Sequence, residues 1–121
     1  MSEPTHEQIP IDFDPRWLGV LQRVKAQFGK APNLESLLFL IGMNELGRLE
    51  ENFSKEQKQD LMHIAVCRLL TYQGYYRLDG TDPDGWPRYI QEKRLDALSL
   101  EAQEELLKRN IIRYFDELEN N

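Results

Sequence analysis

The sequence is poor in the residues from which most metal and redox centres are built. Among its 121 residues there is one cysteine, Cys67, and there are two histidines. One cysteine cannot form an intramolecular disulfide, which is typical of proteins in a reducing compartment. The sequence also lacks a glycine-rich phosphate loop and a Gly-x-Ser-x-Gly nucleophile elbow. It leaves catalysis open but favours a protein that has no cofactor and is not an enzyme.

Long apolar runs and an excess of basic residues are missing as well. The longest apolar run, Leu37 to Ile41, is far shorter than the roughly 20 residues that span a bilayer. The first 14 residues are acidic and polar, unlike a secretory signal. The chain has 15 Lys and Arg against 21 Asp and Glu, a balance that argues against nucleic acid as a partner. We therefore expect a cytoplasmic protein that binds neither membranes nor nucleic acids.

The length and composition predict one helical domain. A chain of 121 residues with 40% hydrophobic residues can bury a core without disulfides or metal. Residues 1–13 contain two prolines and several charges, and we expect them to form an extended or disordered arm. Ile9, Ile11 and Phe13 occupy every second position, so the end of this arm is a candidate to lie along the domain and bury one of its own edges. Residues 14–121 are expected to form the single domain.

The first half of the domain predicts two helices. Asp14 is a suitable N-cap before Pro15, and a stripe of apolar residues follows to Phe28. A second helix is expected from Asn33 to about Asn52, because the run is long, apolar and almost free of β-branched residues. Glycines interrupt this run, and either a kink or close contact with another helix would offset their cost.

The best-signalled helix covers residues 55–73. Ser54 and Gln57 have the spacing of a capping box, and Gly74 is suited to the left-handed conformation that ends a helix. Apolar residues cover more than one face of this segment, so we expect other elements to pack around it. Ser99 is the expected cap of a last helix. The predicted fold is mainly all-α, with about four main helices in an orthogonal or bundle-like array.

Residues 75–90 predict a small β-hairpin or an irregular aromatic loop. Tyr76 and Leu78 share one face if the segment is extended, and Asp82-Pro83-Asp84-Gly85 suits a type I turn. Pro87 would confine the returning strand to an edge. The alternative is that Pro87 begins a helical turn.

An aromatic cluster in this region is the main functional signal. It combines tyrosines and a tryptophan with Arg88, the residue types that dominate binding hot spots. We predict a non-enzymatic protein-interaction module with an unknown partner. Its anchors would be Tyr75, Tyr76, Trp86 and Arg88. The structural alternative is that the rings attach the hairpin to the helices, and both roles can hold on opposite faces.

A second hypothesis is a small-ligand or metal site, with or without catalysis, between the hairpin and the central helix. Asp60, His63 and Cys67 lie on one side of that helix, where His63 would act as base or ligand and Cys67 as thiolate. Asp82 and Asp84 are the candidates for hard-ion ligands, although the loop lacks the full calcium-binding pattern. The more ordinary interpretation makes His63 and Cys67 core or boundary residues and the loop a solvated turn.

Two further contacts are possible. The second and third helices carry a wide apolar surface, which predicts a homodimer seam through one of them. The first helix carries Arg16, Arg23 and Lys25 and no acid, so docking onto an acidic surface competes with the simpler interpretation of a helix with its cations in water.

Residues 45–87 contain the sequence FSKEQKQDLMH at the start of the central helix, followed by GYY and DGWP. In these sequences the segment resembles a group of small bacterial proteins of unknown function. The resemblance implies a bacterial, cytoplasmic, helical protein, and it carries over no functional residues.

Overall fold

The computed structural model describes residues 9–48 and 52–120. Contacts divide the chain into two compact units. One unit comprises the chain up to Pro32 together with the chain from Leu100 onward, and the other is Asn33–Ser99. A single domain from residue 14 to residue 121 therefore stays a prediction.

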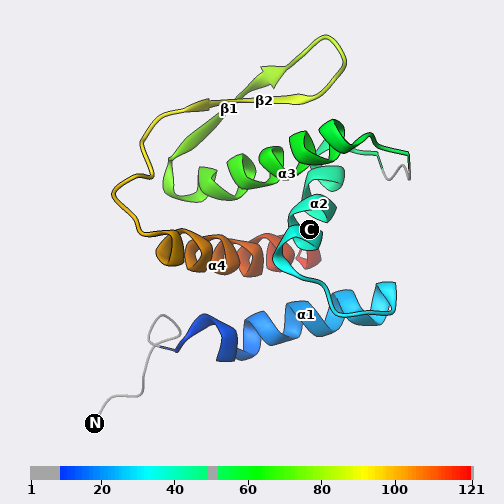
Figure 1. Ribbon diagram of the computed structural model, residues 1–121, viewed down its shortest axis with the longest axis vertical. Helices are drawn as coiled ribbons and strands as arrows, with labels where there is room; N and C mark the ends of the chain where they lie inside the picture. Colours follow the sequence, from blue (N-terminus) through cyan, green and yellow to red (C-terminus); the bar gives the residue numbers. More distant parts are fainter. Residues whose placement is uncertain (1–8, 49–51, 121) are drawn as a thin grey trace. The chain divides into compact units, whose positions relative to one another are not determined.

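The described residues form four α-helices and one two-stranded antiparallel sheet (Figure 1). This confirms the predicted mainly α fold with a small β-hairpin. None of the described helices is long and apolar enough to cross a bilayer. The elements are α1 (Pro15–Phe28), α2 (Leu34–Leu46), α3 (Lys55–Leu70), β1 (Tyr76–Thr81), β2 (Pro87–Gln91) and α4 (Leu100–Glu119).

In the unit Asn33–Ser99, α3 is the element against which α2 and both strands pack. The predicted capping box is present, because Ser54 Oγ accepts from the Gln57 amide and Gln57 Oε1 accepts from the Ser54 amide. The helix ends at Leu70, and a short 3-10 turn leads to Gly74 at φ 77°. Leu61 and Leu69 are fully buried, so the expectation that other elements pack around this helix is confirmed.

α2 ends earlier than the sequence suggested. The prediction of a helix to about Asn52 is wrong, because Gly47 takes the left-handed conformation and caps the helix after Leu46. Residues 49–51 lie outside the described part of the chain. Gly42 has the other role that was expected of a helix glycine: a Cβ at this position would overlap the backbone of Leu61 on α3. The two helices therefore approach closely at Gly42.

The hairpin lies along α3 (Figure 1). Tyr76 pairs with Gln91 and Leu78 pairs with Tyr89, so Tyr76, Leu78 and Tyr89 share one face of the sheet, as the alternation predicted for the first two. Pro87 is the first residue of β2, so the alternative of a helical turn at this proline is wrong. The loop between the strands is what brings the candidate site together.

In the unit that contains both chain ends, α1 and α4 run side by side in the same direction (Figure 1). Two ion pairs agree with this direction. Lys108 pairs with Asp12, which precedes α1, and Arg23 near the end of α1 pairs with Glu119 at the end of α4. Where an extended arm was expected, Ile11–Phe13 form a 3-10 turn. Ile11 is buried and Phe13 is 74% exposed, so they do not share a buried edge. The rest of the predicted arm, residues 1–8, lies outside the described residues.

Candidate functional site

A hollow of about 420 Å³ opens between the hairpin loop and the first half of α3. We call it the turn hollow. Its lining comes from three segments that are distant in the sequence, namely the residue after the α2 cap, the first turns of α3 and the loop that precedes β2. The lining residues are Arg48, Gln57, Asp60, Asp82, Asp84 and Trp86.

Asp82 shapes the loop side of the turn hollow. Its Oδ1 accepts hydrogen bonds from the amides of Asp84 and Trp86, both at 2.9 Å. Its amide donates to the Trp86 carbonyl and its carbonyl accepts from the Gly85 amide, as the predicted turn requires. One carboxylate oxygen of Asp82 is therefore occupied in holding the loop, and it fixes the backbone of Trp86, a residue that lines the hollow.

Arg48 ties the loop to α2. Its Nη2 donates to the Asp84 carbonyl at 3.2 Å, across 36 residues of sequence. Arg48 follows directly on Gly47, so the early end of α2 is what directs this arginine toward the loop. A helix that continued to Asn52 would have placed Arg48 on a helical turn instead.

The carboxylates of the turn hollow outnumber its single arginine by three to one. In the ranges 9–48 and 52–120, the side chains of Asp60 and Asp84 have no hydrogen-bond or ion-pair partner. Both aspartates are exposed and Trp86 is half-buried. The hollow thus presents unpaired negative charge beside Trp86.

Tyr76 and Tyr89 face α3 and attach the hairpin to it. The Tyr76 ring meets the His63 ring edge to face, with centroids 6.5 Å apart. Burial raises the pKa of Tyr89 to about 12, with the Glu45 carboxylate adding to the effect and Arg68 opposing it. Burial likewise raises the pKa of Tyr76. These two rings therefore attach the hairpin to the helices, which is the structural alternative to a binding role.

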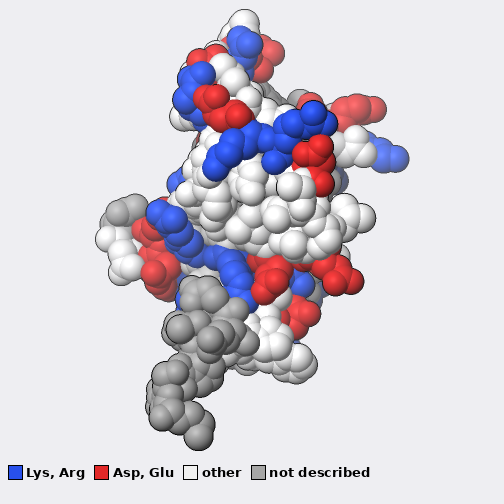
Figure 2. Space-filling view, turned by 90° about the vertical axis from the view of Figure 1, so that its left-hand side faces the viewer, with Lys and Arg blue, Asp and Glu red and all other residues white. Residues whose placement is uncertain are grey.

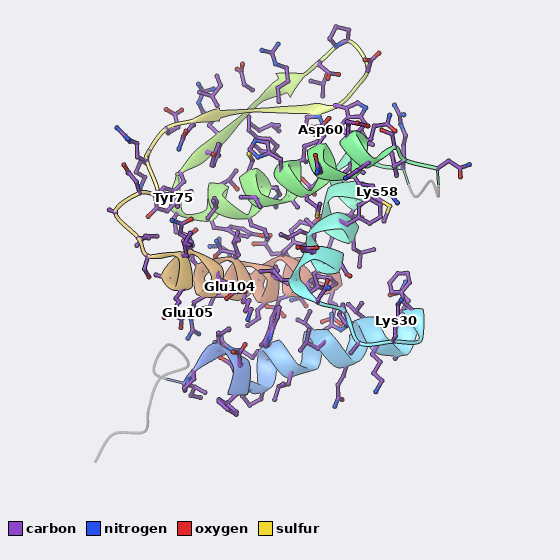
Figure 3. The ribbon with its side chains drawn as sticks, in the orientation of Figure 1. Lys30, Lys58, Asp60, Tyr75, Glu104 and Glu105 are labelled. Atoms are coloured by element: carbon purple, nitrogen blue, oxygen red, sulfur yellow. The ribbon has the colours of Figure 1, made fainter. Side chains whose placement is uncertain are left out.

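The other predicted anchors lie apart from the turn hollow. Tyr75 lies at the opposite end of α3 from Asp60 (Figure 3), where its ring lies 5.1 Å from Lys93 Nζ. Arg88 is exposed on the hairpin face that points away from Tyr89. Side chains of both signs mix over the hairpin end of the molecule in the view of Figure 2, so no field of one sign covers it. Of the four predicted anchors, the turn hollow includes Trp86.

The proposed thiol site near His63 has the wrong chemistry for catalysis. Nε2 of His63 lies 3.5 Å from Sγ of Cys67, but His63 is exposed and Cys67 is 1% exposed. Burial raises the pKa of Cys67 to about 11, so the thiol stays protonated at neutral pH. A nucleophilic cysteine needs a lowered pKa. The pair therefore fits the core-and-boundary interpretation.

Metal binding by the loop has no geometric support. Within the part of the chain that the structure describes, no three of the His, Cys, Asp and Glu side chains lie close enough together to hold a metal ion. Asp82 and Asp84 are joined by the hydrogen bond that closes the turn.

Sequence analysis identified Trp86, Asp82 and Asp84 but missed what they meet. Asp60 was considered only with His63 and Cys67, and Arg48 was not considered. The one local signal was Gly47, a helix-ending residue followed by an arginine.

A comparison of the chain with protein-family models, with curated proteins and with solved structures finds no match.

Proposed function

We propose that this protein is a non-enzymatic interaction module that captures a lysine or arginine side chain of a partner protein in the turn hollow. The observation that carries the proposal is the pair of carboxylates, Asp60 and Asp84, that have no partner among the described residues and line the same hollow as the half-buried Trp86. The setting we infer is the cytoplasm, where the single cysteine stays reduced.

The chemistry of the turn hollow favours a cation. An indole face attracts a cation within about 6 Å of the ring centroid, by roughly 0.5 to 2 kcal/mol as the site is desolvated. Two carboxylates beside the ring add charge-assisted hydrogen bonds. Arg48 opposes a cation, but its position at the Asp84 carbonyl keeps the loop in place. The lining therefore suits one charged head group of the partner.

The site is built before the partner arrives. Asp82 holds the loop through two hydrogen bonds, and Tyr76 and Tyr89 attach the hairpin to α3. A preformed site loses little side-chain freedom on binding, which is the property of a good hot spot. Arg88 and Ile90, both exposed on the outer face of the hairpin, extend the proposed contact for a partner that covers the loop.

A calorimetric titration with an oligolysine peptide tests this function. We expect saturable binding that weakens with salt, since exposed charges are screened beyond about 8 Å at physiological ionic strength. Trp86→Ala should weaken binding by about tenfold, and Asp60→Asn with Asp84→Asn should weaken it by at least as much. An oligoglutamate peptide of equal length should not bind.

Asp96→Asn is the control for the loss of an exposed carboxylate outside the hollow. Asp96 is an exposed aspartate of the same unit that pairs with Arg94 and does not line the hollow. We expect this variant to bind oligolysine like the unchanged protein. Equal losses in the control and in the Asp60 and Asp84 variant, or full binding by Trp86→Ala, would contradict the proposal.

The predicted homodimer through α2 or α3 gains no support from the surface. Their large apolar side chains are buried or half-buried, and the exposed ones in the described part of the chain belong to other segments. A seam on either helix would therefore be built from half-buried apolar side chains. Self-association stays a prediction, and light scattering at micromolar concentration measures it directly.

A further inference from the structure

A second hollow, of about 480 Å³, lies in the unit that contains both chain ends, between α1 and α4. We call it the arginine hollow. Arginine is the commonest residue type among the side chains that line it, and a single acid joins them. The lining residues are Arg16, Gly19, Val20, Arg23, Arg109, Ile112, Arg113 and Asp116.

The two helices contribute to the arginine hollow in the same pattern. Each supplies the residues i, i+3, i+4 and i+7 of one face, starting from Arg16 on α1 and from Arg109 on α4. Because the helices run in the same direction, the two stripes lie side by side along the hollow. Val20 and Ile112 give the lining an apolar part between the charged side chains.

Two of the arginines are held in position by a buried acid. Asp14 is fully buried, and it binds Arg16 through Nη2 at 2.9 Å and Nε at 3.2 Å. Nη1 of Arg109 lies 3.8 Å from the same carboxylate. Asp14 therefore orients Arg16, whereas Arg109 is held by Asp14 together with Glu105, whose Oε1 lies 2.7 Å from Nη2. Neither acid lines the hollow.

The other two arginines have exchangeable partners. Arg23 pairs with Glu119 and Arg113 pairs with Glu117, and all four side chains are between 42% and 59% exposed. Exposed ion pairs of this kind contribute little to stability. An anion that entered the hollow would therefore exchange with these glutamates at small cost.

Gly19 gives an independent indication that the hollow is kept open. Glycine is among the least favourable residues in a helix interior, and it usually has a packing reason to be there. At Gly42 the reason is the backbone of Leu61, but a Cβ at Gly19 would meet no described atom within 4 Å. Packing among the residues that the structure describes does not require a glycine at position 19, whereas a ligand in the hollow that it lines would require the space.

We propose that the arginine hollow binds a small organic phosphate. Its volume lies within the range of about 300 to 1,000 Å³ that is usual for small-molecule sites. Guanidinium groups bind phosphate bidentately, and a phosphate offers several terminal oxygens to donors that converge from two helices. A carboxylate offers two oxygens in one plane. The apolar side chains Val20 and Ile112 suit the organic part of such a ligand.

Calorimetric titration of the full-length protein with inorganic pyrophosphate tests the assignment. We expect saturable binding of one pyrophosphate per chain. Arg23→Gln with Arg113→Gln should weaken it at least tenfold, because two of the guanidinium groups that line the hollow are lost. The ion pairs of these two arginines are exposed, so their loss should cost little stability. Gly19→Leu should also weaken it at least tenfold, because the side chain would take the space of the ligand. Citrate, which has carboxylates only, should bind more weakly than pyrophosphate.

Lys25→Gln with Arg94→Gln is the matched control, since it removes the same charge from positions that do not line the hollow. We expect it to bind pyrophosphate within twofold of the unchanged protein. The proposal is overturned by an absence of saturable binding, by an equal loss in the control, or by unchanged binding in Gly19→Leu. Citrate that binds as tightly as pyrophosphate would overturn the choice of phosphate. Circular dichroism shows whether each variant is folded. If Gly19→Leu is unfolded, the binding of the variant Arg23→Gln with Arg113→Gln decides the proposal alone.

Discussion

The same substitution should have opposite effects at two glycines in helix interiors. Gly19 lies in α1 and Gly42 lies in α2. Replacing a mid-helix glycine by alanine gains up to about 1 kcal/mol of helix propensity. At Gly19 a new Cβ would meet no described atom within 4 Å, so the full gain is expected. Gly19→Ala should raise the free energy of unfolding by about 1 kcal/mol and the melting temperature by about 4 °C.

At Gly42 the gain in propensity is outweighed by overlap. A Cβ there would lie 2.7 Å from the carbonyl carbon of Leu61 and 3.0 Å from its Cβ. A backbone carbonyl cannot rotate away, so α2 and α3 would have to separate and loosen a core in which Leu37 and Ile41 are almost fully buried. Overpacking of this kind costs about 1 to 3 kcal/mol. After the gain in propensity, Gly42→Ala should lower the free energy of unfolding by about 1 to 2 kcal/mol.

Urea unfolding of both variants in phosphate-free buffer measures the two changes. The slope of free energy against urea should stay constant, so that shifts of the midpoint report stability alone. A Gly42→Ala variant that is as stable as the unchanged protein would refute the close approach of α2 and α3. A Gly19→Ala variant that is destabilised would refute the open space at position 19.

Three more outcomes follow from the structure. Asp14→Asn should lower the free energy of unfolding by about 2 to 3 kcal/mol in a urea titration, because Arg16 and Arg109 lose a buried counter-charge while the amide still caps α1. Cys67 should react with a disulfide reagent at neutral pH only after unfolding, since its pKa of about 11 leaves about one thiol in ten thousand ionised; prompt colour from the folded protein would contradict its burial. Tyr89 should be a late tyrosine in an ultraviolet titration, and Tyr89→Phe should remove that step. Because the pKa of Tyr89 is raised on folding, its contribution to stability is intact below about pH 10 and is lost as the pH rises through about 12.

Helix ends that depend on neighbouring residues could be predicted from the sequence. The Ser54–Gln57 capping box and the Asp14 cap each involve residues within three positions of one another, so the sequence contains the whole signal. The hairpin was predicted for the same reason, since Asp82 makes its turn-closing bonds to residues two to four positions away. Local hydrogen bonding is thus enough to locate these elements.

The roles of Gly42 and Gly47 could not be separated from the sequence. Both interrupt one apolar run, and either could have been a close contact or a helix end. The contact of Gly42 with Leu61 is what keeps the first inside the helix, and that contact depends on how α2 meets α3. Tertiary packing, which a local pattern does not contain, therefore decided that Gly42 stays inside α2, whereas the cap at Gly47 is made by hydrogen bonds to Met43 and Asn44.

The two candidate sites were only partly visible for the same reason. The turn hollow joins Arg48 to Asp84 across 36 residues, and no spacing rule connects them. In the arginine hollow, the cations of α1 were noticed as a basic helix, but Arg109 and Arg113 on α4 were not considered. The shared i, i+3, i+4 and i+7 pattern of the two helices was the signal that could have revealed the pairing.

The opposite charge preferences of the two hollows make their failures distinguishable. Trp86 and its neighbouring aspartates favour a cation, whereas the arginines of α1 and α4 favour an anion. Each pair of charge variants should therefore affect one ligand: Asp60→Asn with Asp84→Asn should spare pyrophosphate, and Arg23→Gln with Arg113→Gln should spare oligolysine. If either pair weakened one ligand and strengthened the other to the same degree, the titrations would report the net charge of the chain, which is −6, and neither hollow would be a site. If each pair of variants weakens only the ligand of its own hollow, local contacts must be responsible, because a change in net charge acts on both ligands at once.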